Sequence, residues 1–101
     1  MTELVLSVSL HELCQYDELD EQLIVEVVDH GIAQPVAGRN TVDWVFDATS
    51  VHWMKKAVRL HTDLEIDWVA VAMVIDLLRR NEALERRNRH FEHQLKRFLD
   101  Q

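Results

Sequence analysis

The first half of the chain almost lacks basic residues. Residues 1–50 contain a single Lys or Arg, Arg39, against ten Asp and Glu residues. Residues 51–101 contain ten basic and eight acidic residues, so the net charge of -7 originates in the N-terminal half. A surface that binds DNA gains most of its affinity from Lys and Arg placed against phosphates. The N-terminal half is therefore poorly suited to direct contact with nucleic acid.

Cysteine, glycine and proline are also scarce. Cys14 is the only cysteine, which excludes an internal disulfide and a paired-cysteine metal site. Its apolar neighbours Leu10 and Leu13 favour a structural role as a small buried hydrophobe. Two glycines and one proline favour helices over a β fold with many turns. Hydrophobic residues make up 48% of the 101 residues, enough for the core of one folded domain.

The sequence offers no long hydrophobic run and no basic leader. Every apolar stretch is shorter than the roughly 18 residues that a membrane span needs. Glu3 stands almost at the start, where a secretory signal would carry basic residues. We therefore expect a cytoplasmic protein with no membrane partner.

Residue patterns for catalysis or metal binding are missing as well. His90 and His93 have a spacing that could ligate a metal, but no third ligand lies within reach in the sequence. His11 and Glu12 are not followed by a second His at the spacing of a zinc protease. There is no glycine-rich phosphate loop and no nucleophile–base set. The sequence predicts neither an enzyme nor a cofactor, a metal or a small-molecule substrate.

Two short helices are predicted near the N-terminus, after a weak strand pattern over 4–8. Ser9 and Glu12 form a capping box at the start of a helix over 10–16. Asp20 is a good N-cap for a second helix over 21–30. Gly31 and Pro35 then end that helix. Two short helices with a tight connection form a helix-turn-helix pattern.

The next segment changes to a strand–turn–strand pattern and then to a third helix. Residues 35–47 combine the turn Gly38-Arg39-Asn40 with strand formers at Val42, Trp44, Val45 and Phe46. Asp47 can cap a helix over 48–62. A hairpin placed after a helix-turn-helix is typical of a winged domain. The predicted fold class is therefore mainly α, a winged helix-turn-helix with a small β-hairpin.

A long helix begins after Asp67 and runs for about thirty residues without a breaker. At 1.5 Å per residue it spans roughly 48 Å, so it must protrude from the domain or pair with another helix. We therefore divide the chain into a winged helix-turn-helix domain, 1–66, and a long C-terminal helix, 67–101. The helix follows a heptad register in which position a holds Val74, Asn81, Asn88 and Leu95, and position d holds Leu77, Leu84, Phe91 and Phe98.

The heptad stripe predicts a homodimer, because an unpaired stripe of this length would leave a large apolar surface in water. The residues expected at the dimer interface are Leu77, Asn81, Leu84, Asn88, Phe91, Leu95 and Phe98. Two Asn residues at a positions could pair across a two-fold axis and fix the register.

Several short segments resemble the chaperone-modulator (CbpM) family, small bacterial proteins with a MerR-like winged helix-turn-helix. The similar stretches are Trp44-Val45-Phe46-Asp47, Ala57-Val58-Arg59-Leu60, Asp63-Leu64-Glu65-Ile66-Asp67-Trp68, Glu12-Leu13-Cys14 and Gly31-Ile32-Ala33-Gln34-Pro35. The resemblance covers nearly the whole chain. One departure is Val69-Ala70-Val71, where MerR-like relatives often place a glycine.

The resemblance implies an inhibitor of a DnaJ-like co-chaperone of the CbpA type. Such a protein binds the J-domain, blocks its use of a DnaK-type chaperone and lowers the DNA association of the co-chaperone. J-domains present a basic helix, which acidic residues could cover. On this hypothesis the partner-binding residues are Asp17, Glu18, Glu21, Glu26, Asp29 and Trp44. Direct DNA binding is not expected.

Two points stay open at this stage. A parallel dimer would place Arg80 and Arg87 opposite Glu85 and Glu92, whereas MerR-like proteins dimerise through an antiparallel helix. The alternative function is a dimeric MerR-like transcriptional regulator, and a third is a coiled-coil adaptor in which the N-terminal domain does not bind the partner itself.

The basic cluster Lys55, Lys56 and Arg59 fits ordinary surface charge better than a phosphate contact.

Overall fold

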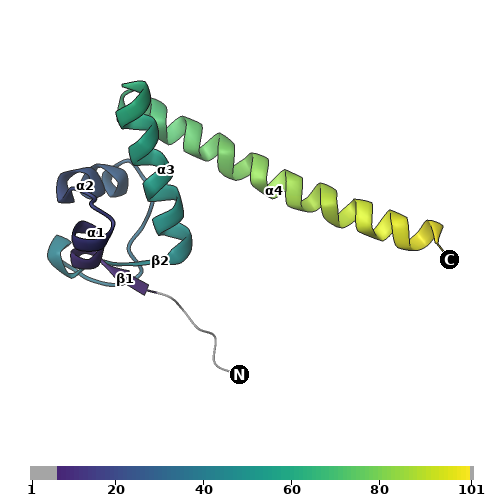
Figure 1. Cartoon of the computed structure of the whole chain (residues 1–101), viewed down its shortest axis with the longest axis horizontal. Helices are drawn as coiled ribbons and strands as arrows, with labels where there is room; N and C mark the ends of the chain where they lie inside the picture. Colours follow the sequence, from purple (N-terminus) through teal and green to yellow (C-terminus); the bar gives the residue numbers. More distant parts are fainter. Residues whose placement is uncertain (1–6, 101) are drawn as a thin grey trace.

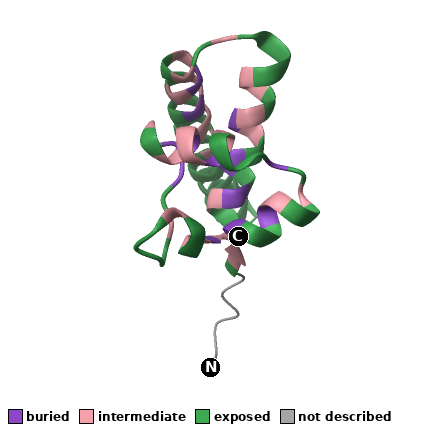
Figure 2. Ribbon diagram, turned by 90° about the vertical axis from the view of Figure 1, so that its left-hand side faces the viewer, coloured by how far each residue is buried: buried purple, intermediate pink, exposed green. Residues whose placement is uncertain are grey.

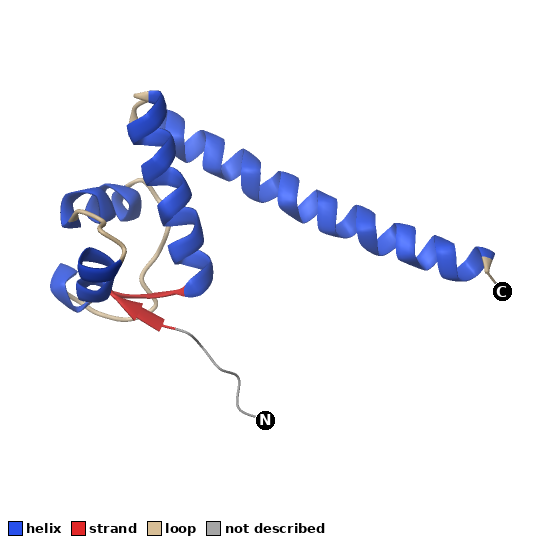
Figure 3. Cartoon of the chain, in the orientation of Figure 1, coloured by secondary structure: helices blue, strands red, loops and turns tan. Residues whose placement is uncertain are grey.

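Four helices account for most of residues 7–100, the part of the chain that this computed structural model describes (Figure 3). The elements in order are β1 (Ser7–Ser9), α1 (Leu10–Tyr16), α2 (Glu21–Asp29), the 3-10 turn η1 (Thr41–Asp43), β2 (Val45–Asp47), α3 (Ala48–Leu64) and α4 (Trp68–Leu99). The first helices gather beside the two strands, and α4 extends far beyond them (Figure 1). The predicted fold class, mainly α with a long C-terminal helix, is confirmed.

Local capping residues define where the helices begin. The Glu12 backbone N–H donates to Ser9 Oγ at 3.2 Å, and the Ser9 N–H donates to the Glu12 carboxylate, so the predicted capping box is present. Asp20, Asp47 and Asp67 accept backbone N–H groups at the starts of α2, α3 and α4. Each such cap contributes about 1 kcal/mol. Gly31, at φ +71, follows α2 as expected.

The small sheet is antiparallel and joins segments far apart in the sequence. β1 pairs with β2, with Val8 opposite Phe46. The strand expected over 4–8 lies partly outside the described residues, and its described part belongs to β1. Residues 35–47 form the expected strand–turn–strand only in part, because Ala37 adds one isolated bridge to Val45. Val42 is not in a strand: it lies exposed in η1, which the Asp43 N–H closes by donating to the Asn40 carbonyl.

The core lies between α1, α2, α3 and the first turns of α4. Figure 2 shows buried residues on the inward sides of these helices. The fully buried side chains include Leu13, Ile24, Ile32, Phe46, Met54, Val71 and Ile75. Since Val71 and Ile75 belong to α4, the beginning of the long helix is an integral part of the N-terminal core. The division at residue 66 stays a prediction, but the hydrophobic core extends past it.

A cation and an aromatic ring fasten α4 to the rest of the domain. The Arg79 guanidinium donates to the carbonyl of Ile32, just after α2, and lies 5.3 Å from the centre of the Trp53 ring. Trp68, the first residue of α4, stacks on His61 at 4.1 Å and on His30 at 6.2 Å between ring centres. These contacts connect α2, α3 and α4 and fix the direction in which the long helix leaves.

Candidate partner-binding face and dimerisation seam

The outward side of α2 is acidic because its apolar residues turn inward. Ile24 and Val27 are fully buried against the core. Glu21 and Asp29 are exposed, and Glu26 is about half exposed at 46% of its side chain. The helical period therefore separates a hydrophobic inner face from a carboxylate-bearing outer face.

A shallow groove runs between the outer face of α2 and the 3-10 turn. Its lining residues are Glu21, Gln22, Val25, Glu26 and Thr41, and we call it the acidic groove. Val25 is half-buried and gives the groove an apolar component, while Glu21 and Glu26 supply two negative charges. Such a surface is suited to a partner that presents basic side chains on an apolar base.

The other predicted partner-binding residues lie around the groove and do not line it. The Asp17 carboxylate is 2.8 Å from Lys55 Nζ and faces a second hollow that Arg59 also lines, so its charge is partly neutralised. Glu18 is exposed in the α1–α2 connection, where it adopts φ +54. Trp44 is half-buried edge-on against Phe46 at 6.1 Å. The structure thus brings Glu21 and Glu26 together and leaves Asp17 in a different setting.

Burial and the negative charge at the start of α2 both act on the thiol pKa of Cys14. Burial raises the pKa of the Cys14 thiol, and the nearby carboxylates of Glu21 and Asp20 raise it further. A higher pKa means a smaller thiolate fraction near neutral pH, so Cys14 is a weak nucleophile there. It is half-buried and packs against the core, in accord with the structural role predicted for it.

The basic cluster on α3 is largely engaged within the molecule. Lys55 pairs with Asp17, and Lys56 Nζ lies 5.5 Å from the centre of the Trp53 ring. Only Arg59 remains, beside the hollow next to Asp17. These contacts are compatible with ordinary surface charge, the interpretation that the sequence favours, which stays a prediction.

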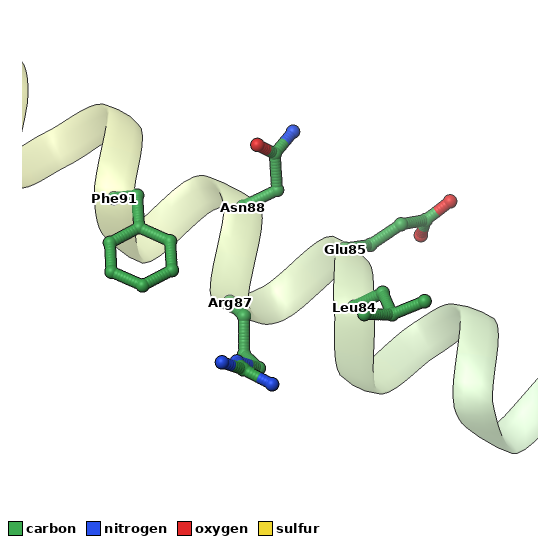
Figure 4. Close-up of a pocket in the computed structure, with 5 residues that line it drawn as sticks. All are labelled: Leu84, Glu85, Arg87, Asn88 and Phe91. Atoms are coloured by element: carbon green, nitrogen blue, oxygen red, sulfur yellow. The ribbon is translucent and has the colours of Figure 1, made fainter.

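The predicted dimerisation residues form one exposed stripe along α4. Leu84, Phe91 and Phe98 expose 61%, 57% and 71% of their surface. Leu77 and Leu95 are equally exposed, and Asn81 and Asn88 lie on the same side. We call this stripe the α4 seam. Figure 4 shows Leu84, Asn88 and Phe91 on successive turns, with Arg87 and Glu85 beside them.

Residues 7–100 contain neither a cluster suited to a metal ion nor a helix suited to crossing a membrane. His90 and His93 stand exposed on α4, and within residues 7–100 no group of three His, Cys, Asp or Glu side chains could hold a metal ion. No helix in that range combines the length and the apolar character that crossing a bilayer requires.

Sequence reasoning missed two residues of this surface. Thr41 lines the acidic groove because η1 packs against α1 and so lies beside the start of α2, an arrangement that no local pattern encodes. The sequence analysis made no prediction for Arg79, which donates to the Ile32 carbonyl just after α2. Its position one turn after the buried Ile75 is the only local signal that it faces the domain.

Comparison with known proteins gives two concordant results. Residues 8–93 match the family described as "MerR HTH family regulatory protein". A protein named "Chaperone modulatory protein CbpM" from Pseudomonas putida is 34% identical over 96 residues, which is 95% of this chain and 94% of that protein. Proteins of the same name are 35% identical in Pseudomonas entomophila, over 94% of this chain and 93% of theirs, and 30% identical in Salmonella paratyphi A, over 98% and 97%. The chain therefore belongs to the CbpM chaperone-modulator family, within the MerR-like helix-turn-helix proteins.

Proposed function

We propose that this protein is a non-catalytic chaperone modulator that binds the J-domain of a DnaJ-like co-chaperone and inhibits its co-chaperone and DNA-binding activities. The relatives are named as modulators of chaperones. The observation that supports J-domain binding is the acidic groove, whose lining combines the carboxylates of Glu21 and Glu26 with the half-buried apolar side chain of Val25. It belongs to a helix-turn-helix half whose only Lys or Arg is Arg39.

The charge placement on α2 supports a binding role over a purely stabilising one. Asp20 and Glu21 at the start of α2 are favoured by the helix dipole, but Asp29 stands in the last turn, where the dipole disfavours it. The last turn of α2 contains no basic residue. The Asp29 carboxylate therefore destabilises α2 by about 0.3–1 kcal/mol in the free chain. Such a cost is expected at a position where a bound basic partner offsets it.

The mechanism that we propose is competition for one basic surface. A J-domain uses a basic helix to contact its DnaK-type chaperone. When that helix lies in the acidic groove, the chaperone is excluded and its ATP hydrolysis is no longer stimulated. Glu21 and Glu26 contact the basic side chains directly, with Glu18, Asp29 and Asp17 at the margin and Trp44 as an aromatic contact near the wing. The complex forms in the cytoplasm.

The protein acts as a homodimer in this proposal. The α4 seam exposes five large apolar side chains in a row, more than a monomeric protein ordinarily leaves in water. A second copy of the same helix would bury them. In a dimer each chain carries its own acidic groove, because the groove lies on α2 and η1 and the seam lies on α4.

Isothermal titration calorimetry with a cognate J-domain tests the proposed face. The double variant Glu21→Lys, Glu26→Lys should weaken binding by about tenfold or more, because two attractions become repulsions. The control is Glu65→Lys, Asp100→Lys, which changes the net charge equally at exposed positions that line neither the acidic groove nor the hollow beside Asp17. The control should bind within about twofold of the wild type.

Two results would count against the proposal. An unchanged dissociation constant for the groove variant would exclude this face, and no binding to any J-domain would exclude the function. A gel-shift assay addresses the alternative, because tight and salt-sensitive binding to duplex DNA would favour a transcriptional regulator.

A further inference from the structure

His30, directly after α2, lies within reach of a carboxylate that lines the acidic groove. Its Nδ1 atom is 3.5 Å from the Glu26 carboxylate and 2.8 Å from the Glu26 backbone oxygen. Glu26 is one of the two acidic residues of the groove, and its side chain is about half exposed. A partner cation that approaches this carboxylate is therefore opposed by any positive charge on His30.

The hydrogen bond to the backbone fixes which nitrogen of His30 can take up a proton. A carbonyl oxygen only accepts, so Nδ1 carries the hydrogen that it donates to the Glu26 carbonyl. In the neutral ring Nε2 is then the nitrogen without a hydrogen, and its protonation makes the whole ring cationic. Histidine is the residue type whose charge ordinarily changes between pH 5 and 8. The side chain of His30 is 29% exposed, so it can exchange protons with water.

The ring of His30 is held in place beside Glu26. It stacks on the indole of Trp68 at 6.2 Å between ring centres, and the hydrogen bond to the Glu26 carbonyl holds its Nδ1 edge. Trp68 is itself fixed, because it is the first residue of α4 and also stacks on His61. A charge that His30 gains therefore appears at a constant position next to the groove.

The other ionisable groups around His30 do not take the place of Glu26. Within residues 7–100, Glu26 is the only carboxylate within 4 Å of a His30 ring nitrogen. On α2, the neighbouring Asp29 is exposed to solvent. From α3, His61 faces the same indole and donates from its Nδ1 to a backbone carbonyl. Asp67, the N-cap of α4, accepts a backbone N–H of its own helix. Glu26 is thus the anion with which a charged His30 pairs.

We propose that His30 makes the acidic groove sensitive to pH: the charged ring pairs with Glu26, offsets one of the two negative charges of the groove and weakens the binding of a basic partner. This inference rests on the proposed function, since it needs a partner in the groove, and it adds a regulation of that site. Protonation of His30 and binding of the partner oppose each other. Binding therefore weakens as the pH falls through the range in which histidine gains its proton, and it recovers as the pH rises.

Calorimetric titration of the full chain with a cognate J-domain at about pH 8 and about pH 6 tests this regulation. The quantity compared is the ratio of the dissociation constant at the lower pH to that at the higher pH. His30→Gln keeps a polar side chain that cannot become charged. The ratio should be about threefold larger for the wild type than for His30→Gln, a size ordinary for a partly exposed charge pair. All chains meet the same J-domain, so the titration of the J-domain itself cancels in the comparison.

Two further variants make the comparison specific. Glu26→Gln keeps His30 but removes the carboxylate, so its ratio should fall to that of His30→Gln even though its binding is weaker at both pH values. The matched control is His93→Gln, which removes an exposed histidine of α4 and should keep the wild-type ratio. Circular dichroism at both pH values shows whether each variant is folded, and Glu26→Gln decides the question if His30→Gln does not fold.

The possible results separate this inference from the proposed function. A wild-type ratio in His30→Gln overturns the role of His30 and leaves J-domain binding intact. A wild-type ratio in Glu26→Gln overturns the pairing with Glu26 in the same way. Loss of the pH effect in both variants, with the effect kept in His93→Gln, supports the proposal. No binding of the wild type at either pH contradicts the proposed function, and the inference falls with it.

Discussion

At the scale of single residues, the segment 35–47, the wing of the winged helix-turn-helix, depends on the absence of a side chain at Gly38. Gly38 adopts φ +103, and a Cβ atom at this position would collide with the Asp43 carbonyl group and the Trp44 nitrogen. Gly31 also has a positive φ, but a Cβ atom there would meet open space. Replacing Gly31 by alanine therefore introduces backbone strain alone, whereas replacing Gly38 introduces strain together with a steric collision.

We predict that Gly38→Ala lowers the free energy of unfolding by about 2–4 kcal/mol, since it combines positive-φ strain with a backbone collision. Gly31→Ala should cost only about 1 kcal/mol, the strain alone. Urea denaturation followed by circular dichroism measures both values. Equal costs for the two variants would mean that the wing loop can move away from Asp43.

The caps are the residue-level features that the sequence predicted best. Ser9, Asp20 and Asp47 were each expected to begin a helix, and each accepts the backbone hydrogen bond of a cap. A cap is a contact within three residues, so its signal is contained in the local sequence. The stacking of Trp68 on His61 and on His30 joins three helices and has no local signal in the sequence, so it could not be predicted.

At the scale of elements, helices were predictable and strand partners were not. α3 and α4 follow from apolar periodicity, although α3 runs to Leu64, two residues beyond the expected end. The α1–α2 pattern likewise needed only local spacing. β2, by contrast, pairs with a segment some forty residues earlier, because Phe46 must reach the core that β1 borders. The acidic groove could not be predicted for the same reason, because Thr41 and Glu21 are distant in the sequence and line one groove only in the folded chain.

The long helix has two parts with different roles, and truncation should separate them. A chain ending at residue 80 keeps Val71, Ile75 and Arg79, so it should fold, bind the J-domain within about threefold of the full chain and sediment as one chain. A chain ending at residue 68 loses two fully buried aliphatic side chains, each contributing about 1.5–3 kcal/mol, and should be largely unfolded.

Circular dichroism, sedimentation and calorimetry on the two truncated chains provide the measurements. A chain ending at residue 80 that folds but no longer binds the J-domain would show that the coil contributes to the partner site. That result would favour the coiled-coil adaptor over the acidic groove as the binding element.

At the scale of the whole molecule, the charge distribution bears on how fast the proposed partner would bind. The charged residues of the N-terminal half are almost all acidic, and the C-terminal half is close to neutral. If the proposed function holds, a basic J-domain is steered toward the end of the molecule that carries the groove. Long-range steering acts through solvent and is weakened by salt.

We predict that raising the salt concentration from about 50 mM to about 500 mM increases the dissociation constant of the J-domain complex by about tenfold, mainly through slower association. Stopped-flow fluorescence at several salt concentrations separates the association and dissociation rates. A dissociation constant independent of salt would indicate that apolar contact, and not the carboxylates, provides the affinity.

The exit of α4 from the domain has a consequence for avidity. Since Arg79 and the stacked Trp68 hold α4 where it leaves the core, the direction of the N-terminal domain relative to α4 is set by rigid contacts and not by a flexible linker. In the proposed homodimer, a target that carries two J-domains would therefore meet two sites held at a fixed separation. Its second binding step would then be intramolecular, and its residence time would depend on whether its own spacing matches that of the rod.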